Sequence, residues 1–145
     1  MIFLKLKVWP VVAGFIVASI IMTLLEFINS FIFPLPKDLN WNDQAAVKAV
    51  TGALPWTAYI LVFVGWAIGA FEGGCTTAWL AAEKKFRVTA VLAVLLVIAG
   101  IADMAILGFP LVFSVLGIIF LGVCPYLGFI ALTTFERKKR ESMAA

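Results

Sequence analysis

The sequence predicts an all-α integral membrane protein built as a four-transmembrane-helix bundle, and three observations predict it. The 145 residues are 64% hydrophobic and only 13% charged, whereas soluble chains run at about 45–50% apolar and about 25% charged. Four apolar runs are each long enough to cross the hydrocarbon core, which takes about 20 helical residues. Runs such as residues 88–100 are apolar on every face, whereas strands of membrane barrels alternate polar and apolar residues.

The predicted spans form a single membrane domain and cover residues 8–33, 55–82, 88–107 and 111–135. A long outer loop, residues 34–54, joins the first two, and a basic tail, residues 136–145, follows the last. Pro34 and Pro36 end the first helix, because proline lacks an N–H donor and disfavours helix in the residue before it. The first apolar stretch exceeds the 7–15 residues of a signal-peptide core, so we expect an uncleaved anchor.

The outer loop carries the pattern of a short amphipathic helix at residues 43–51. Asn40 and Asn42 are candidate N-caps, and Asp43 suits the first turn. The apolar residues that follow recur at helical spacing: Val47, Val50 and Leu54. The loop's two flanking tryptophans are of a type enriched at lipid headgroups: Trp41 and Trp56. The segment is either a connector that covers the ends of the bundle or a lid over a binding site.

The basic residues predict the orientation. Nine of the eleven lysines and arginines precede the first span, separate the second from the third, or follow the fourth: Lys5, Lys7, Lys84, Lys85, Arg87, Arg137, Lys138, Lys139 and Arg140. Only Lys37 and Lys48 lie in the outer loop. Because short cytoplasmic loops are enriched in lysine and arginine, we expect a multi-pass inner-membrane protein with both termini cytoplasmic. The basic tail is sufficient as a topology anchor and also suits anionic lipid headgroups.

The composition argues against an enzyme. The chain has no histidine, which excludes a histidine base, histidine-ligated metals and the Ser-His, Cys-His and HExxH arrangements. Cys75 and Cys124 lie in separate spans and form no CxxC pair. We therefore expect no catalytic residue, no metal and no cofactor, with a carboxylate-only lipid or quinone enzyme as the weakest alternative. Nucleic-acid binding is not expected either, since no basic fold lies outside the bilayer.

Three carboxylates lie within the spans without a basic residue beside them: Glu26, Glu72 and Asp103. A carboxylate inside a bilayer stays protonated, binds a cation or reaches water. Counting 1.5 Å per residue, Glu26 lies roughly 12 Å below Pro34, and Asp103 lies roughly 10 Å below Pro110. Both are therefore in the outer half and would meet, and titrate as a coupled pair, if the first and third spans are neighbours. Glu72 lies deeper.

The first span places Glu26 on a polar face. Ser19, Thr23, Glu26 and Ser30 recur at helical spacing, with Asn29 beside them. The residues predicted to form an ion, proton or polar-network site are Glu26, Asp103, Glu72, Asn29 and Thr23. The alternative is structural, with a protonated Glu26 bonded to Asn29 or to a neighbouring carbonyl.

Small residues predict how the helices pack. Gly65, Gly69 and Gly73 form a glycine zipper in the second span, suited to close contact within the chain or between two copies. Gly117 is a further packing glycine in the fourth span, where Pro125 is expected to kink the helix. The pair Gly73-Gly74 beside Glu72 is a point of weakness, as in the broken helices of transporters.

Several motifs together resemble a family of small four-span bacterial inner-membrane proteins of uncharacterised function. They run along nearly the whole chain: Glu26, Pro34-x-Pro36, Asp43, Leu54-Pro55, Gly65-Trp66, Gly69, Gly73-Gly74 and Phe109-Pro110. The resemblance implies the membrane location and transfers no residue role. Small multidrug-resistance transporters also have four short helices and a first-span glutamate, but here Glu26 lies late in its span. DoxX-like proteins are similar only in size.

Two functions remain from the sequence. The first is a non-enzymatic accessory or assembly subunit that packs through its glycine-rich helix faces. The alternative is an oligomeric proton- or cation-coupled small transporter with Glu26 as the titrating site. Either role makes membrane lipids and a homo-oligomer or larger membrane complex the expected partners.

Overall fold

The computed structural model describes residues 8–144, and that part of the chain holds five helices and no strand. They are α1 (Trp9–Ile32), α2 (Gln44–Gly52), α3 (Trp56–Leu80), α4 (Lys85–Leu107) and α5 (Leu111–Ala144). All except α2 are long and apolar enough to cross a membrane. The predicted all-α class and the four long apolar helices are therefore confirmed. Lys5 and Lys7, which the orientation argument used, lie outside the described residues.

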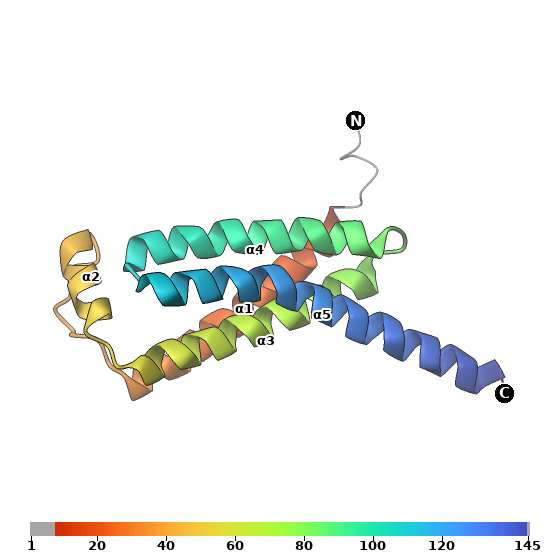
Figure 1. The fold of residues 1–145 in the computed structure, drawn as a ribbon, viewed down its shortest axis with the longest axis horizontal. Coiled ribbons are helices and arrows are strands. Elements are labelled where there is room, and N and C mark those ends of the chain that lie inside the picture. The colour runs from red at the N-terminus through yellow and green to blue at the C-terminus, as the bar shows by residue number, and fades with distance from the viewer. Residues whose placement is uncertain (1–7, 145) are drawn as a thin grey trace.

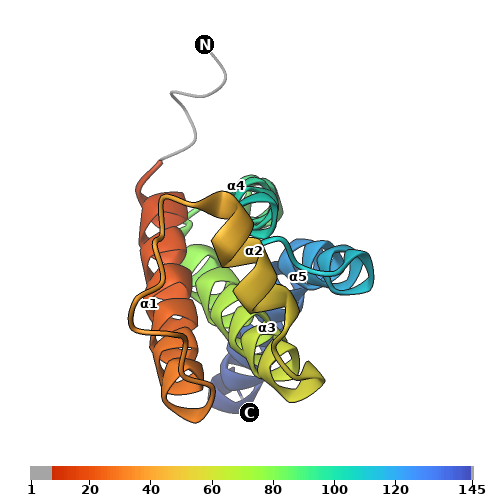
Figure 2. The same cartoon turned by 90° about the vertical axis from the view of Figure 1, so that its left-hand side faces the viewer.

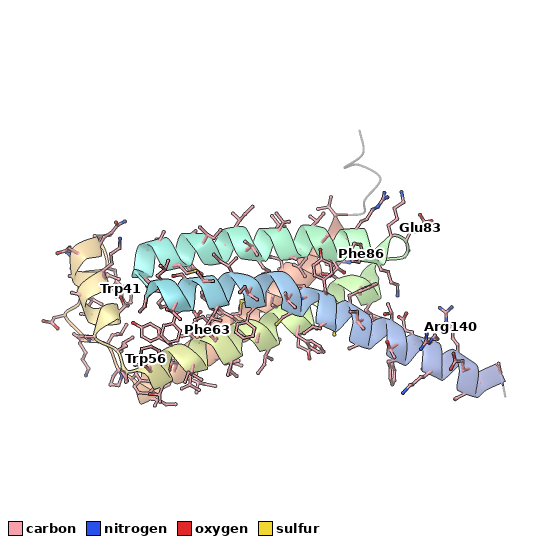
Figure 3. The ribbon with its side chains drawn as sticks, in the orientation of Figure 1. Trp41, Trp56, Phe63, Glu83, Phe86 and Arg140 are labelled. Carbon is pink, nitrogen blue, oxygen red and sulfur yellow. The ribbon has the colours of Figure 1, made fainter. Side chains whose placement is uncertain are left out.

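The helix α3 is the centre of the bundle and the most buried of the four long helices. It packs against α1, α4 and α5, whereas α1 and α5 do not contact one another within the described chain. Figures 1 and 2 show α2 lying across the end where α1 finishes and α3 begins. We call this end the α2 end of the bundle. Figure 3 shows Trp41 and Trp56 near it, with Glu83, Phe86 and Arg140 toward the opposite end.

The short helix predicted at residues 43–51 is present as α2, and the structure corrects its cap. The Asp43 carboxylate accepts hydrogen bonds from the backbone N–H groups of Ala45 and Ala46 at 3.0 and 3.2 Å. Asp43 is the N-cap because its backbone is extended and its side chain therefore reaches these two donors. The side chain of Asn40 instead accepts from the backbone of Asn42, so neither asparagine caps the helix.

The α2 helix is tied to the bundle by two buried hydroxyl groups. The Thr51 hydroxyl donates to the carbonyl of Leu107, the last residue of α4. The Tyr59 hydroxyl donates to the carbonyl of Thr51. The ring of Tyr59 stacks on the ring of Phe113, with the ring centroids 4.7 Å apart. Phe113 stacks in turn on Phe63. The aromatic core of the bundle is therefore at the α2 end.

The glycine row of α3 packs against α1. A Cβ atom at Gly73 would lie 2.8 Å from the Gly14 carbonyl oxygen, and one at Gly69 would lie 2.8 Å from the Ala18 carbonyl oxygen. Gly65 faces the side chain of Leu25. Such short distances require glycine, because a side chain at Gly69 or Gly73 would push the two backbones apart. The row serves a contact within this chain.

The helix α5 meets α3 at a second close crossing. Gly74 lies against the backbone of Pro125, and Gly128 lies against the carbonyl of Phe71. The helix continues through Pro125, which donates no backbone hydrogen bond. In Figure 1, α5 runs beside α4 in its first half and then turns away. Gly117 belongs to the first half, where a Cβ atom added to it would lie 2.8 Å from the ring of Trp66.

The sequence predicts that the fourth span ends at residue 135, but α5 is helical to Ala144. No proline or glycine follows Gly128, so nothing in the local sequence stops the helix. An ion pair of 2.9 Å between Lys85 and Glu136 joins this extension to the first turn of α4. Residues 136–144 of the predicted tail are therefore a helical extension of the bundle.

Candidate functional site: a groove between α1 and α4

A groove with one apolar part and one polar part runs between α1 and α4. The two helices diverge toward the α2 end (Figures 1 and 2). The apolar part is a cavity of about 470 Å³ at the opposite end, and it is lined only by apolar residues of the two helices, from Val8 to Ile16 and from Val88 to Ala99. Phe15 and Ala99 also line the polar part. The two parts therefore adjoin, and we call them together the α1–α4 groove.

The polar part of the groove is a cavity of about 120 Å³ nearer the α2 end. Ser19, Thr23 and Glu26 line it from α1, and Asp103 lines it from α4. Trp66 of α3 also faces the cavity, as does Leu121 of α5. Two carboxylates that lie 77 positions apart in the sequence thus share one cavity, and each residue is exposed.

Glu26 is held by an indole that the sequence alone did not assign to the site. The Nε1–H of Trp66 donates to Glu26 Oε1 at 3.0 Å. Trp66 is only 3% exposed, and its ring meets Phe63 and Phe109 edge-on with centroids 5.9 Å away in each case. Packing in the aromatic core therefore holds the indole N–H in place, and the hydrogen bond from this N–H holds one oxygen of Glu26. The sequence carried a signal for this hydrogen bond, because a buried tryptophan far from a helix end needs an acceptor for its indole N–H.

Asp103 completes the site from α4. It lines the same cavity as Glu26, from the opposite helix. Among residues 8–144, neither side chain has a basic group within ion-pair distance. A carboxylate inside a bilayer stays protonated, reaches water or attracts a positive group.

Asn29 does not join the carboxylates. Its Nδ2 group donates to the carbonyl of Ala58 in α3 at 3.3 Å. Its Oδ1 atom is buried and has no hydrogen-bond partner in the described part of the chain. The predicted alternative in which Asn29 bonds Glu26 is therefore not the arrangement present, because Asn29 faces the α1–α3 contact and Trp66 supplies the donor instead.

Glu72 also lies apart from the groove. Its neighbours Gly73 and Gly74 are buried against α1 and α5, and this packing turns Glu72 outward, where it is exposed. Of the five predicted residues, the structure thus brings Thr23, Glu26 and Asp103 together and leaves Asn29 and Glu72 elsewhere.

Neither the carboxylates nor the thiols form a metal site in the described residues. No group of three or more histidine, cysteine, aspartate or glutamate side chains there could hold an ion. Cys75 and Cys124 are free thiols, and the Cys75 thiol donates to the carbonyl of Gly128 at 3.3 Å. This bond gives Cys75 a place in the α3–α5 crossing.

Comparison of the chain with protein-family models, curated proteins and solved structures found no match. No residue role is therefore transferred from a relative.

Proposed function

We propose that the chain is a non-enzymatic accessory or assembly subunit of a larger membrane complex, and that the α1–α4 groove is the surface that binds a partner. The observation that carries the proposal is the pair of exposed carboxylates, Glu26 and Asp103, in one groove between apolar helices. On insertion scales an aspartate near the bilayer centre costs about 2.5–3.5 kcal/mol. A partner that covers the groove removes these groups from hydrocarbon.

The proposed location is the bacterial inner membrane, with both termini cytoplasmic and α2 on the outer side. The support is the distribution of charge. Lys84, Lys85 and Arg87 lie between α3 and α4 or in the first turn of α4, and the ion pair with Glu136 brings the basic part of α5 to the same end. Arg140 is seen there in Figure 3. An excess of lysine and arginine of this kind is typical of the cytoplasmic side.

The proposed docking surface is the groove and not the glycine-rich helix faces, which are covered within the chain. Gly65, Gly69 and Gly73 are covered by α1, and Gly117 is covered by the side chains of Met104 and Trp66. A partner would have to displace α1 to use the first three. The groove is reached without breaking any contact of the bundle.

The test is the size of the particle that carries the chain. The tagged chain would be expressed at its natural level, extracted in a mild detergent and sized by native mass spectrometry. We expect a complex with a second, different protein, and we expect the Glu26→Gln/Asp103→Asn double variant to lose it. Glu72→Gln is the matched control and should retain it. Wild-type chain that is recovered alone contradicts the proposal.

The second candidate is an oligomeric proton- or cation-coupled transporter with Glu26 as the titrating group. It is favoured by the hydroxyls of Ser19 and Thr23, which line the same small polar cavity as Glu26 and Asp103. Proteoliposomes that contain the purified chain would show flux driven by a proton gradient, and Glu26→Gln would abolish it. Equal flux in the wild type and in this variant rejects the transporter.

A further inference from the structure

We propose that the occupant of the α1–α4 groove is a transmembrane helix of a different protein, carrying a lysine or arginine in the half of the bilayer next to α2. This inference rests on the proposed function and names the partner's chemistry. Two properties of the groove support it, namely its length and the order of its apolar and polar parts. The third support is that the described spans of this chain offer no suitable cation.

The length of the groove matches a helix rather than a small amphiphile. On α1 the lining runs from Val8 to Glu26, and on α4 it runs from Val88 to Asp103. At 1.5 Å per residue these distances are about 27 and about 22 Å, most of the roughly 30 Å of hydrocarbon. On both helices the lining residues recur every three or four positions, so each helix offers one face to a third helix.

The order of the lining specifies where the partner carries its charge. The apolar part is lined by valine, leucine, isoleucine, phenylalanine and alanine side chains, which pack against an apolar helix surface. Only at Glu26 and Asp103 does the groove become acidic. The Trp66 indole already bonds one oxygen of Glu26, and Asp103 accepts no hydrogen bond from a described side chain. One ammonium or guanidinium group satisfies both carboxylates, as acidic and basic residues pair inside other membrane proteins.

A second copy of this chain does not provide that charge. In the described part of the chain, the basic residues of the long helices are confined to the first turn of α4 and to α5 from Arg137 onward. Both positions belong to the end opposite α2 (Figure 3), whereas the carboxylates lie toward the α2 end. In a copy placed alongside in the same orientation, the long helices bring no lysine or arginine to the level of Glu26 and Asp103. Lys37 and Lys48 lie at the α2 end but outside the long helices, in the loop and in α2. The complementary group therefore comes from another polypeptide.

The experiment measures binding of synthetic transmembrane peptides to the full-length chain in lipid nanodiscs by energy transfer. The test peptide is a leucine-alanine helix with one lysine in the third that lies beside Glu26 and Asp103. One matched peptide has leucine at that position, and another has the lysine in the opposite third. We expect the test peptide to bind at least about tenfold more tightly than either, which is about 1.4 kcal/mol.

The variants identify the site of that preference. Glu26→Gln/Asp103→Asn should bind all three peptides equally, and Glu72→Gln should keep the full preference. Ala99→Trp fills the groove between its two parts and should weaken every peptide. Circular dichroism confirms that each variant is helical before its binding is measured.

The inference is overturned by equal binding of the three peptides to the wild type, or by a preference that survives in the double variant. A preference lost equally in Glu72→Gln also overturns it, because charge in general would then be responsible. The proposed function fails separately, when the chain is recovered alone from its own membrane although the lysine peptide binds. A heteromeric complex together with indifferent peptides leaves the proposed function standing and removes this inference.

Discussion

The contact between Gly73 and α1 makes a sharp prediction about stability. A Cβ atom at Gly73 would lie 2.8 Å from the Gly14 carbonyl oxygen and 2.9 Å from the Ala18 Cβ atom. Ordinary contacts of this kind begin near 3.4 Å, so Gly73→Ala requires α1 and α3 to separate by about half an ångström. Overpacking of a close contact costs about 1–3 kcal/mol. Both obstacles belong to helix backbones or to a Cβ atom, so no side chain can rotate away to relieve them.

The matched control is Gly52→Ala, because a Cβ atom at Gly52 would meet nothing within 4 Å. This change adds helix propensity and should leave stability unchanged or raise it by up to ~1 kcal/mol. The assay is reversible unfolding of the purified chain in mixed micelles of increasing SDS content, followed by circular dichroism. We expect a loss of about 1–3 kcal/mol for Gly73→Ala only. Equal stability of the two variants would show that the close packing of α1 on α3 does not exist.

Three further changes test how the groove and the α2 end are held. Trp66→Phe removes the N–H that donates to Glu26, so the infrared band of the Glu26 carboxyl group should shift. The free energy of unfolding should fall by about 0.6–1.7 kcal/mol, and an unchanged infrared band contradicts the hydrogen bond. Asp43→Ala removes the N-cap of α2 and should cost about 0.5–2 kcal/mol of local stability, seen as faster hydrogen exchange across α2. Asn40→Ala is its control, and equal exchange in both variants would contradict the assigned cap. Thr51→Val breaks the hydroxyl bond to the end of α4, so α2 should exchange faster while α4 stays protected, and unchanged exchange in α2 speaks against the tie.

The fold was largely predictable because its main signal is local. Four long apolar runs mark four helices in any bundle, and the spacing of Val47 and Val50 marks α2. The depth of Glu26 and Asp103 could also be counted, because Pro34 and Pro110 mark the ends of their helices. Their placement in one cavity needed one additional fact that no local pattern carries, namely that α1 and α4 are neighbours.

The rest depends on how each helix is rotated about its axis. A hydropathy pattern that is apolar on every face does not specify rotation, so the outward direction of Glu72 could not be derived. The outward direction follows from the packing of Gly73 against the backbone of α1 and of Gly74 against the backbone of α5. The bond from Trp66 to Glu26 depends on the same rotation of α3. The helical extension of α5 was missed because charge marks the end of a span and not the end of a helix.

Every proposal about the α1–α4 groove depends on the position of Glu26 and Asp103 on its two sides. The most direct test of this position is chemical cross-linking in membranes, in a chain whose Cys75 and Cys124 have been replaced by alanine. Glu26→Cys and Asp103→Cys together should be joined by a thiol-specific reagent with a short spacer. Glu72→Cys with Asp103→Cys should not be joined. Absence of the first cross-link, or equal yields in the two pairs, would contradict the groove and every proposal that rests on it.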